Sequence, residues 1–158
     1  MPGHWLFKSE PGEYSIADLA REPRKTGRWD GIRNYQARNF LRDEVKLNDL
    51  AFFYHSSCKQ PGIVGIAKIV SAPYPDPGQF LPDGPYFDSK ATPAAPRWYS
   101  VDLQHVETFA TVITPGDMRN LDGLENMYLF KQGRLSIQPV NDQEWQQIMA
   151  LAKSRAPR

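Results

Sequence analysis

The stretch WDGIRNYQARNFLR, residues 29–42, joins an aromatic ring, a turn and a basic helix start within fourteen residues. Its Asp-Gly pair predicts a turn directly after Trp29, and Asn34 is a favoured N-cap for the helix that would follow. On such a helix Arg38 and Arg42 share a face, because residues four apart are neighbours in the helical period. An indole can stack on a planar ligand, while guanidinium and helix-start N–H groups attract phosphate. The stretch therefore predicts a ligand site better than a piece of core.

Length and composition predict one folded domain over residues 1–158. A chain of 158 residues can bury roughly two-thirds of its unfolded surface. Its single cysteine, Cys58, has no partner for an intramolecular disulfide, and its first residues lack the basic and apolar regions of a secretion signal. No apolar run approaches the roughly 18 residues of a membrane-spanning helix. We therefore expect an intracellular protein, cytoplasmic in a bacterium or nuclear in a eukaryote, with no membrane partner.

The net charge of +1 conceals a local basic excess. Residues 21–42 contain seven basic side chains and two acidic ones. Such a patch is either a solvated face or a surface for a phosphate-bearing partner, and the charge pattern alone does not separate these two possibilities.

The remaining elements predict an α+β fold with a curved, mostly antiparallel sheet. Apolar or alternating runs predict strands at residues 4–8, 50–55, 63–71, 97–108 and 133–140. Capping residues predict helices that start after Ser15, Asn34, Thr114 and Asn141, and a brief helix over residues 124–130. Residues 22–28 read as a basic loop, and seven prolines between residues 72 and 96 predict a long irregular loop. Gly65 within a strand predicts a bulge or a close backbone approach.

Several classes of chemistry find no support in the sequence. The three histidines are far apart and the chain has no Cys-x-x-Cys spacing, so we expect no metal site. No glycine-rich phosphate loop follows a strand, and we expect no cofactor. Cys58 near His55, or Ser56 beside it, could be proposed as a nucleophile. Ser56 and His55 are adjacent, and adjacent residues on a strand point to opposite faces, which makes that pair geometrically poor. A hydrogen-bonding His55 at a strand end is the better interpretation.

The segment Lys8-Ser9-Glu10-Pro11 ends the first predicted strand with polar side chains. A glutamate at such a strand end can accept a hydrogen bond from an exocyclic amine, and a serine hydroxyl can donate or accept at a base edge. The alternative interpretation is an exposed loop with an ordinary surface salt bridge.

The four tryptophans fall into different contexts. Trp5 and Trp145 lie in apolar periodic segments, which predicts burial in the core. Trp29 follows a basic segment and precedes a turn, so stacking on a ligand is at least as well supported as burial. Trp98 follows the proline-rich loop and has an intermediate context.

Seven motifs, in order from His4 to Trp145, make the chain resemble the EVE domain family. They are HWLFKSEP, WDGIRNYQARNFLR, FFYHSS, GIVGIAKI, PYFDSK, PRWYSVDL and RLSIQPV. The resemblance implies a PUA-like fold, in which a curved sheet or barrel is flanked by short helices and which is related to YTH and ASCH domains. It also implies a pocket for a modified base in DNA or RNA.

The resemblance implies a set of site residues as well. Those of the base pocket would be Lys8, Ser9, Glu10, Pro11, Trp29, Asn34, Tyr35, Tyr54, His55, Ser56, Arg134 and Ser136. By analogy with the aromatic cage of YTH domains, Trp29 would form one wall and Tyr86, Phe87 or Trp98 a second. From the basic residues themselves, we expect phosphate contacts from Arg28, Arg33, Arg38 and Arg42.

Three functions follow from these observations. The first is a non-enzymatic reader of a modified base that is flipped out or single-stranded, with Trp29 stacking and Ser9 and Glu10 reading the base edge. The second is an enzyme acting on a nucleobase or small ligand, with Glu10 as general base and His55 as proton shuttle. The third is a protein interaction module with a vestigial pocket. The sequence favours the first and leaves the choice between DNA and RNA open.

Overall fold

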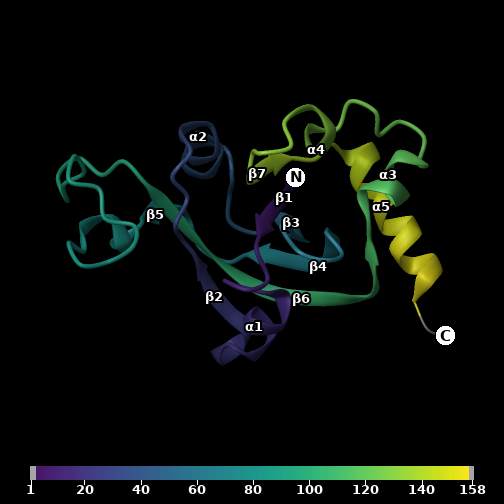
Figure 1. Ribbon diagram of the computed structural model, residues 1–158, viewed down its shortest axis with the longest axis horizontal. Helices are drawn as coiled ribbons and strands as arrows, with labels where there is room; N and C mark the ends of the chain where they lie inside the picture. Colours follow the sequence, from purple (N-terminus) through teal and green to yellow (C-terminus); the bar gives the residue numbers. More distant parts are fainter. Residues whose placement is uncertain (1–2, 157–158) are drawn as a thin grey trace.

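The computed structural model describes residues 3–156, and within them seven strands form one mixed sheet (Figure 1). The strand order is β2-β6-β4-β3-β1-β7, and the short β5 pairs with β6. The β1–β3 pair is parallel and the other pairs are antiparallel. The strands are β1 His4–Ser9, β2 Thr26–Trp29, β3 Leu50–His55, β4 Gly62–Ile69, β5 Tyr74–Pro75, β6 Tyr99–Ile113 and β7 Ile137–Pro139. The predicted α+β class with a mostly antiparallel sheet is confirmed.

The sheet curls so that its distant strands face one another. The indole of Trp29 on β2 lies 5.4 Å from the ring of Phe7 on β1 and 5.3 Å from that of Phe53 on β3, although β6 and β4 stand between these strands in the sheet. The register shifts within the β3–β4 and β4–β6 pairs, and such bulges increase local twist and bending. One shift occurs at Gly65, where a Cβ would collide with the carbonyl oxygen of Glu107. The structure therefore confirms both the bulge and the close backbone approach that were predicted as alternatives at this glycine.

Five α-helices flank the sheet within the described residues. They are α1 Ile16–Arg21, α2 Tyr35–Asp43, α3 Pro115–Arg119, α4 Tyr128–Lys131 and α5 Asp142–Arg155. Each of the four predicted N-caps accepts a hydrogen bond from a backbone N–H in the first turn of its helix, and three of them form full capping boxes. No helix in residues 3–156 has the length and apolarity that crossing a membrane requires.

Two apolar clusters lie on opposite faces of the sheet, because successive strand residues point to opposite sides. One contains Phe7 and Phe53 and packs against α1 and α2. The other contains Phe52 and packs against α5. Trp5 and Trp145 are 5% and 7% exposed, so their predicted burial is confirmed.

Several predicted boundaries were wrong. The segment expected to be a loop at residues 22–28 contains the 3-10 turn η1 Pro23–Lys25 and most of β2, which pairs with β6 residues 101–104. That partner is more than seventy residues away, so no local pattern indicates the strand. The helix expected at 124–130 is limited to α4, and the strand expected at 133–140 to β7. Strand β6 continues to Ile113, and the proline-rich loop contains β5 and the 3-10 turn η2 Pro77–Phe80.

Candidate functional site

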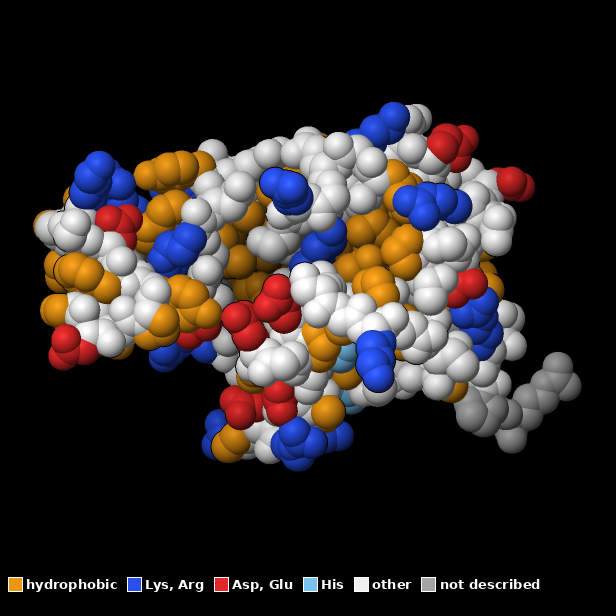
Figure 2. Space-filling model, in the orientation of Figure 1, with side chains coloured by type: hydrophobic (Ala, Val, Ile, Leu, Met, Phe, Trp, Pro, Cys, Tyr) orange, Lys and Arg blue, Asp and Glu red, His pale blue; other side chains and the backbone are white. Residues whose placement is uncertain are grey.

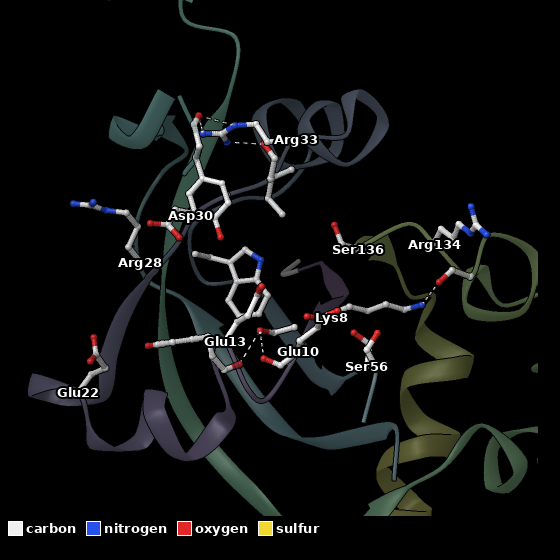
Figure 3. Close-up of a pocket in the computed structure, with 18 residues that line it drawn as sticks. Lys8, Glu10, Glu13, Glu22, Arg28, Asp30, Arg33, Ser56, Arg134 and Ser136 are labelled. Carbon is white, nitrogen blue, oxygen red and sulfur yellow. Dashed lines mark hydrogen bonds between the residues drawn. The ribbon is translucent and has the colours of Figure 1, made fainter. Parts of the chain in front are cut away.

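A hollow of about 720 Å³ opens where the ends of β1 and β2 meet the loops that follow β1, β2 and β3, the proline-rich loop and the loop before β7 (Figure 3). Acidic and basic side chains lie side by side around the centre of the face that Figure 2 shows. The lining residues are Lys8, Ser9, Glu10, Glu13, Tyr14, Glu22, Arg28, Trp29, Asp30, Gly31, Ile32, Arg33, Ser56, Ser57, Tyr86, Gly133, Arg134 and Ser136.

The parallel pairing of β1 and β3 brings two of these segments together. Ser9 stands opposite His55 in the register, so both strands end at the same edge of the sheet. The backbone N–H of Ser56 donates to the carbonyl of Ser9 at 2.9 Å. Because of this pairing, the polar residues after each strand meet at the hollow, although they are almost fifty residues apart in the chain.

Trp29 lines the hollow but is almost entirely enclosed. Only 5% of the residue is exposed. Phe7 and Phe53 contact its indole at centroid distances of 5.4 and 5.3 Å, and the ring of Tyr14 lies nearly perpendicular to it at a centroid distance of 6.4 Å. The sequence allowed either stacking or burial for this ring, and the structure places it in the floor of the hollow.

Tyr86 stands at the rim as the more accessible aromatic ring. The residue is 37% exposed, and its ring lies against Gly31. The guanidinium of Arg33 donates to the Tyr86 carbonyl at 2.8 Å and lies 5.3 Å from the centre of the ring. Arg33 is itself held by the fully buried carboxylate of Asp76 at 3.0 Å. This chain of contacts fixes the proline-rich loop against the turn that follows β2.

Lys8 and Ser9 use their polar atoms to build the wall. The ammonium of Lys8 donates to the carbonyl of Gly133 and lies over the ring of Tyr54, and burial lowers the pKa of this lysine. The hydroxyl of Ser9 donates to the carbonyl of Tyr14 at 2.7 Å. Both side chains therefore secure the loops around the hollow.

The hollow is electrostatically balanced, since four basic and four acidic side chains line it. Partial burial of the Asp30 carboxylate and the nearby charge of Asp76 raise the pKa of Asp30. Figure 3 shows Arg28 and Asp30 on one side of the hollow, and Arg134 with Ser136 on the other. Arg134 has no carboxylate partner within residues 3–156.

Ten of the nineteen residues predicted for the base pocket or for phosphate contacts line this hollow. They are Lys8, Ser9, Glu10, Arg28, Trp29, Arg33, Ser56, Tyr86, Arg134 and Ser136. The other nine lie elsewhere, and they are Pro11, Asn34, Tyr35, Arg38, Arg42, Tyr54, His55, Phe87 and Trp98.

The strand-end residues Tyr54 and His55 have structural partners. Tyr54 belongs to the apolar cluster on the other face of the sheet, because it neighbours Phe53 and alternates with it. The Nε2 atom of His55 accepts a hydrogen bond from the N–H of Ile16, the first residue of α1, at 3.1 Å, and burial lowers the pKa of this histidine.

The aromatic candidates beyond the rim pack on one another. Trp98 is 5% exposed, stacks on Tyr35 at 4.9 Å and donates to the carboxylate of Asp88. Phe87 is exposed, but unlike Tyr86 beside it, it does not line the hollow. Pro11 lies in the turn after β1 and does not line the hollow either.

The predicted helix-start residues of α2 also have other partners. The side chain of Asn34 caps the helix and lines a neighbouring hollow of about 320 Å³. Arg38 donates to the carbonyl of Arg97 at 2.7 Å, and Arg42 pairs with Asp43 at 2.7 Å. Arg38 and Arg42 are therefore already engaged by other groups of the protein.

Sequence reasoning missed eight lining residues, namely Glu13, Tyr14, Glu22, Asp30, Gly31, Ile32, Ser57 and Gly133. A signal for two of them was present, because the turn after Pro11-Gly12 folds back on Glu10. The N–H groups of Glu13 and Tyr14 both donate to the Glu10 carbonyl at 2.9 Å. No group of three or more metal-ligating side chains occurs in the described part of the chain.

Comparison with known proteins places this chain in a family. The EVE domain model matches residues 3–151. The chain belongs to the EVE domain family. This agrees with the motifs that the sequence carries from residue 4 to residue 145.

Relatives of this EVE domain include thymocyte nuclear protein 1 of Gallus gallus and of Homo sapiens. The chicken protein is 44% identical, with 96% of this chain and 69% of the relative aligned. The human protein is 42% identical, with 96% and 74% aligned.

Solved structures share the fold closely. A protein from Pseudomonas putida is 50% identical, with a TM-score of 0.88 over 94% of this chain and 99% of that one. The human THYN1 protein, solved in complex with 5-methylcytosine-containing DNA, is 42% identical, with a TM-score of 0.90 over 96% and 98% of the two chains. An ASCH protein from Zymomonas mobilis, at 10% identity and a TM-score of 0.58 over 94% and 98%, shares the fold alone.

Proposed function

We propose that this EVE domain is a non-enzymatic module that binds a modified base of DNA or RNA in the 720 Å³ hollow. A 5-methylated cytosine in DNA is the first candidate, because a similar human protein was solved with DNA containing that base. The observation that carries the proposal is the hollow itself, whose volume falls in the range of about 300–1,000 Å³ typical of small-ligand sites. An intracellular location, where nucleic acids occur, is part of the proposal.

The base must leave its stack to enter such a hollow. A base inside a duplex is covered on both faces, so it enters only when flipped out or single-stranded. Tyr86 is the ring that supports stacking, because it is exposed at the rim and braced by Arg33. Arg134 lies on the side of the hollow away from Arg28 (Figure 3), and we propose that these two arginines face the phosphates that flank the base.

The balanced charge of the hollow supports recognition of a neutral base rather than a free anion. Phosphate neutralisation by two arginines implies a modest salt dependence. The slope of log affinity against log salt concentration should be about −1.4 for a single strand and about −1.8 for duplex DNA. Identity must then come from contacts with the base, since backbone contacts carry no sequence information.

The enzyme hypothesis receives less support from the geometry. A proton shuttle must reach the ligand, but His55 does not line the hollow and its Nε2 accepts the N–H of Ile16. Chromatography of a modified nucleoside after incubation with the protein tests this directly. We expect no product, and turnover that is lost in Glu10→Gln would favour the enzyme.

Fluorescence anisotropy with labelled oligonucleotides tests the proposed function. Matched strands carry cytosine or 5-methylcytosine, as single-stranded DNA, duplex DNA and RNA. A methyl group in a fitted apolar site contributes about 1–3 kcal/mol, so we expect the methylated strand to bind about 10-fold to 200-fold more tightly. Equal affinity for both strands in every format would contradict the proposal.

A blocking variant locates the binding. Ser136→Trp places a large side chain in the hollow, whereas Ser154→Trp places the same side chain on the exposed part of α5. We expect the first substitution to abolish selective binding and the second to leave it unchanged.

A further inference from the structure

The indole of Trp29 offers no face on which a base could stack. Stacking covers a whole ring face, and Trp29 is only 5% exposed. Phe7 and Phe53 contact the ring at interplanar angles of 52° and 89°. Opening a face would require these core side chains to move out of the cluster that joins β1, β2 and β3.

The polar edge of the same ring is free. Trp5 and Trp98 each donate their indole N–H to a carboxylate at 2.8 Å. The Nε1–H of Trp29 has no acceptor within residues 3–156. Unlike the Tyr14 hydroxyl, which is buried without a partner, this N–H group is accessible from outside. A residue that is 95% enclosed therefore keeps an accessible, unpaired donor on the surface of the hollow.

We propose that Trp29 reads the bound base by donating a hydrogen bond from its indole Nε1–H to the ring acceptor N3 of a cytosine. This inference rests on the proposed function and assigns a role within it. Stacking is then the task of Tyr86, and Trp29 determines which base is accepted.

Recognition of N3 would distinguish 5-methylcytosine from thymine, which a contact with the 5-methyl group cannot do. Thymine carries the same 5-methyl group as 5-methylcytosine, so an apolar contact with that methyl cannot separate the two. The edges differ, because cytosine has an acceptor at N3 and an amine at position 4, whereas thymine has an N3–H donor and a carbonyl. The indole nitrogen can only donate. It can donate to N3 of cytosine, but it cannot form a hydrogen bond with the N3–H of thymine, which is also a donor. A carboxylate of the hollow such as Asp30 can accept a hydrogen bond from the cytosine amine.

Nuclear magnetic resonance of the indole N–H groups tests the contact directly. The protein is labelled with ¹⁵N-tryptophan and titrated with a single strand that carries 5-methylcytosine. We expect the Trp29 indole proton to move downfield and to exchange more slowly with water, because it becomes hydrogen-bonded. Saturable binding that leaves this signal unchanged would overturn the inference.

An isosteric substitution measures the contribution of the donor without emptying the core. Trp29→benzothienylalanine keeps the bicyclic shape and replaces N–H by sulfur. Trp145 provides the matched control, since its Nε1–H also lacks an acceptor in residues 3–156 but the residue lies between His4 and Phe52, outside the hollow. We expect the Trp29 substitution to weaken 5-methylcytosine binding on the order of tenfold and to reduce the preference over thymine, and the Trp145 substitution to change neither.

A base analogue completes the test. In 3-deaza-5-methylcytosine a C–H group replaces N3, so a protein with Trp29 should bind it on the order of tenfold more weakly than 5-methylcytosine. The benzothienylalanine protein should bind both strands equally. If it still separates them, Trp29 is not the donor, whereas a wild-type protein that binds no modified strand would contradict the proposed function itself.

Discussion

The ring of Tyr86 lies across Gly31 so closely that a Cβ at position 31 would stand 2.8 Å from its Cζ atom. Gly31 also has a φ of +79°, which side chains rarely adopt. The turn after β2 therefore requires glycine at position 31 for two reasons. Its backbone angle is unfavourable for other residues, and a side chain there would clash with the ring of Tyr86.

Gly31→Ala should destabilise the protein and disturb the rim. Strain at a positive φ costs on the order of 1–2 kcal/mol, and the clash with Tyr86 adds to it. Urea denaturation measures the change in the free energy of unfolding. Gly12→Ala is the control, because a Cβ there meets nothing within 4 Å, and it should change the free energy by less than about 0.5 kcal/mol.

Tyr86→Ala should weaken binding of the modified strand on the order of tenfold or more, because stacking contributes about 1–3 kcal/mol per base. Tyr86→Phe keeps the ring and should retain most of the affinity. Phe87→Ala serves as the matched control, since Phe87 is exposed on the same loop and does not line the hollow. Equal losses in Tyr86→Ala and Phe87→Ala, measured by anisotropy, would show that the loop acts through another surface.

Asp76→Ala should be strongly destabilising. The Asp76 side chain is fully buried and accepts from the N–H groups of Gly31 and Gly78 at 2.9 and 2.8 Å, as well as from Arg33 at 3.0 Å. Its removal leaves the partly buried Arg33 guanidinium with carbonyl partners but no counter-charge, and leaves two N–H groups unpaired, which costs about 3–5 kcal/mol. Thermal and urea denaturation measure this loss. Asp83→Ala, at an exposed position of the same loop, should have little effect.

The stability of the protein should fall as the pH decreases below about 6.5, in part because of His55. Burial lowers the pKa of His55 in the folded protein below its ordinary value of 6.5, so the unfolded chain binds the proton more readily. The stabilising effect of the neutral ring is therefore fully present above pH 6.5 and is lost as the pH falls through the folded pKa.

Denaturation between pH 7.5 and pH 5 in wild type and His55→Gln measures this contribution. The variant should lose less stability over that interval. His105, whose pKa is also lowered by burial, contributes in the same direction, so His105→Gln provides a comparison. A pH dependence that is identical in wild type and His55→Gln would contradict the assigned role.

Local signals in the sequence predicted local structure well. Ser15, Asn34, Thr114 and Asn141 each begin a helix, because an N-cap depends only on residues within one turn. Strand β2 could not be predicted in the same way, since its stability comes from pairing with β6 and its residues TGRW have no alternating pattern.

Part of the site was also predictable from local sequence signals. Ser9 and Ser56 meet because β1 and β3 pair in parallel, and the family motifs indicated both strand ends. The enclosure of Trp29 was not predictable, because it depends on how far the sheet curls to bring Phe7 and Phe53 against the ring. Gly65 indicated one bulge, but the register also shifts at other positions of the β3–β4 and β4–β6 pairs, for which the sequence contains no signal.

Chemical-shift mapping tests the central claim, that the base binds in the hollow. The ¹⁵N-labelled protein is titrated with a short single strand that carries 5-methylcytosine, and with the unmethylated strand as control. We predict saturable shifts at Lys8, Trp29, Tyr86 and Arg134 with the methylated strand, and weaker shifts with the control. Shifts confined to α5 or β6, or the same shifts with both strands, would contradict the account.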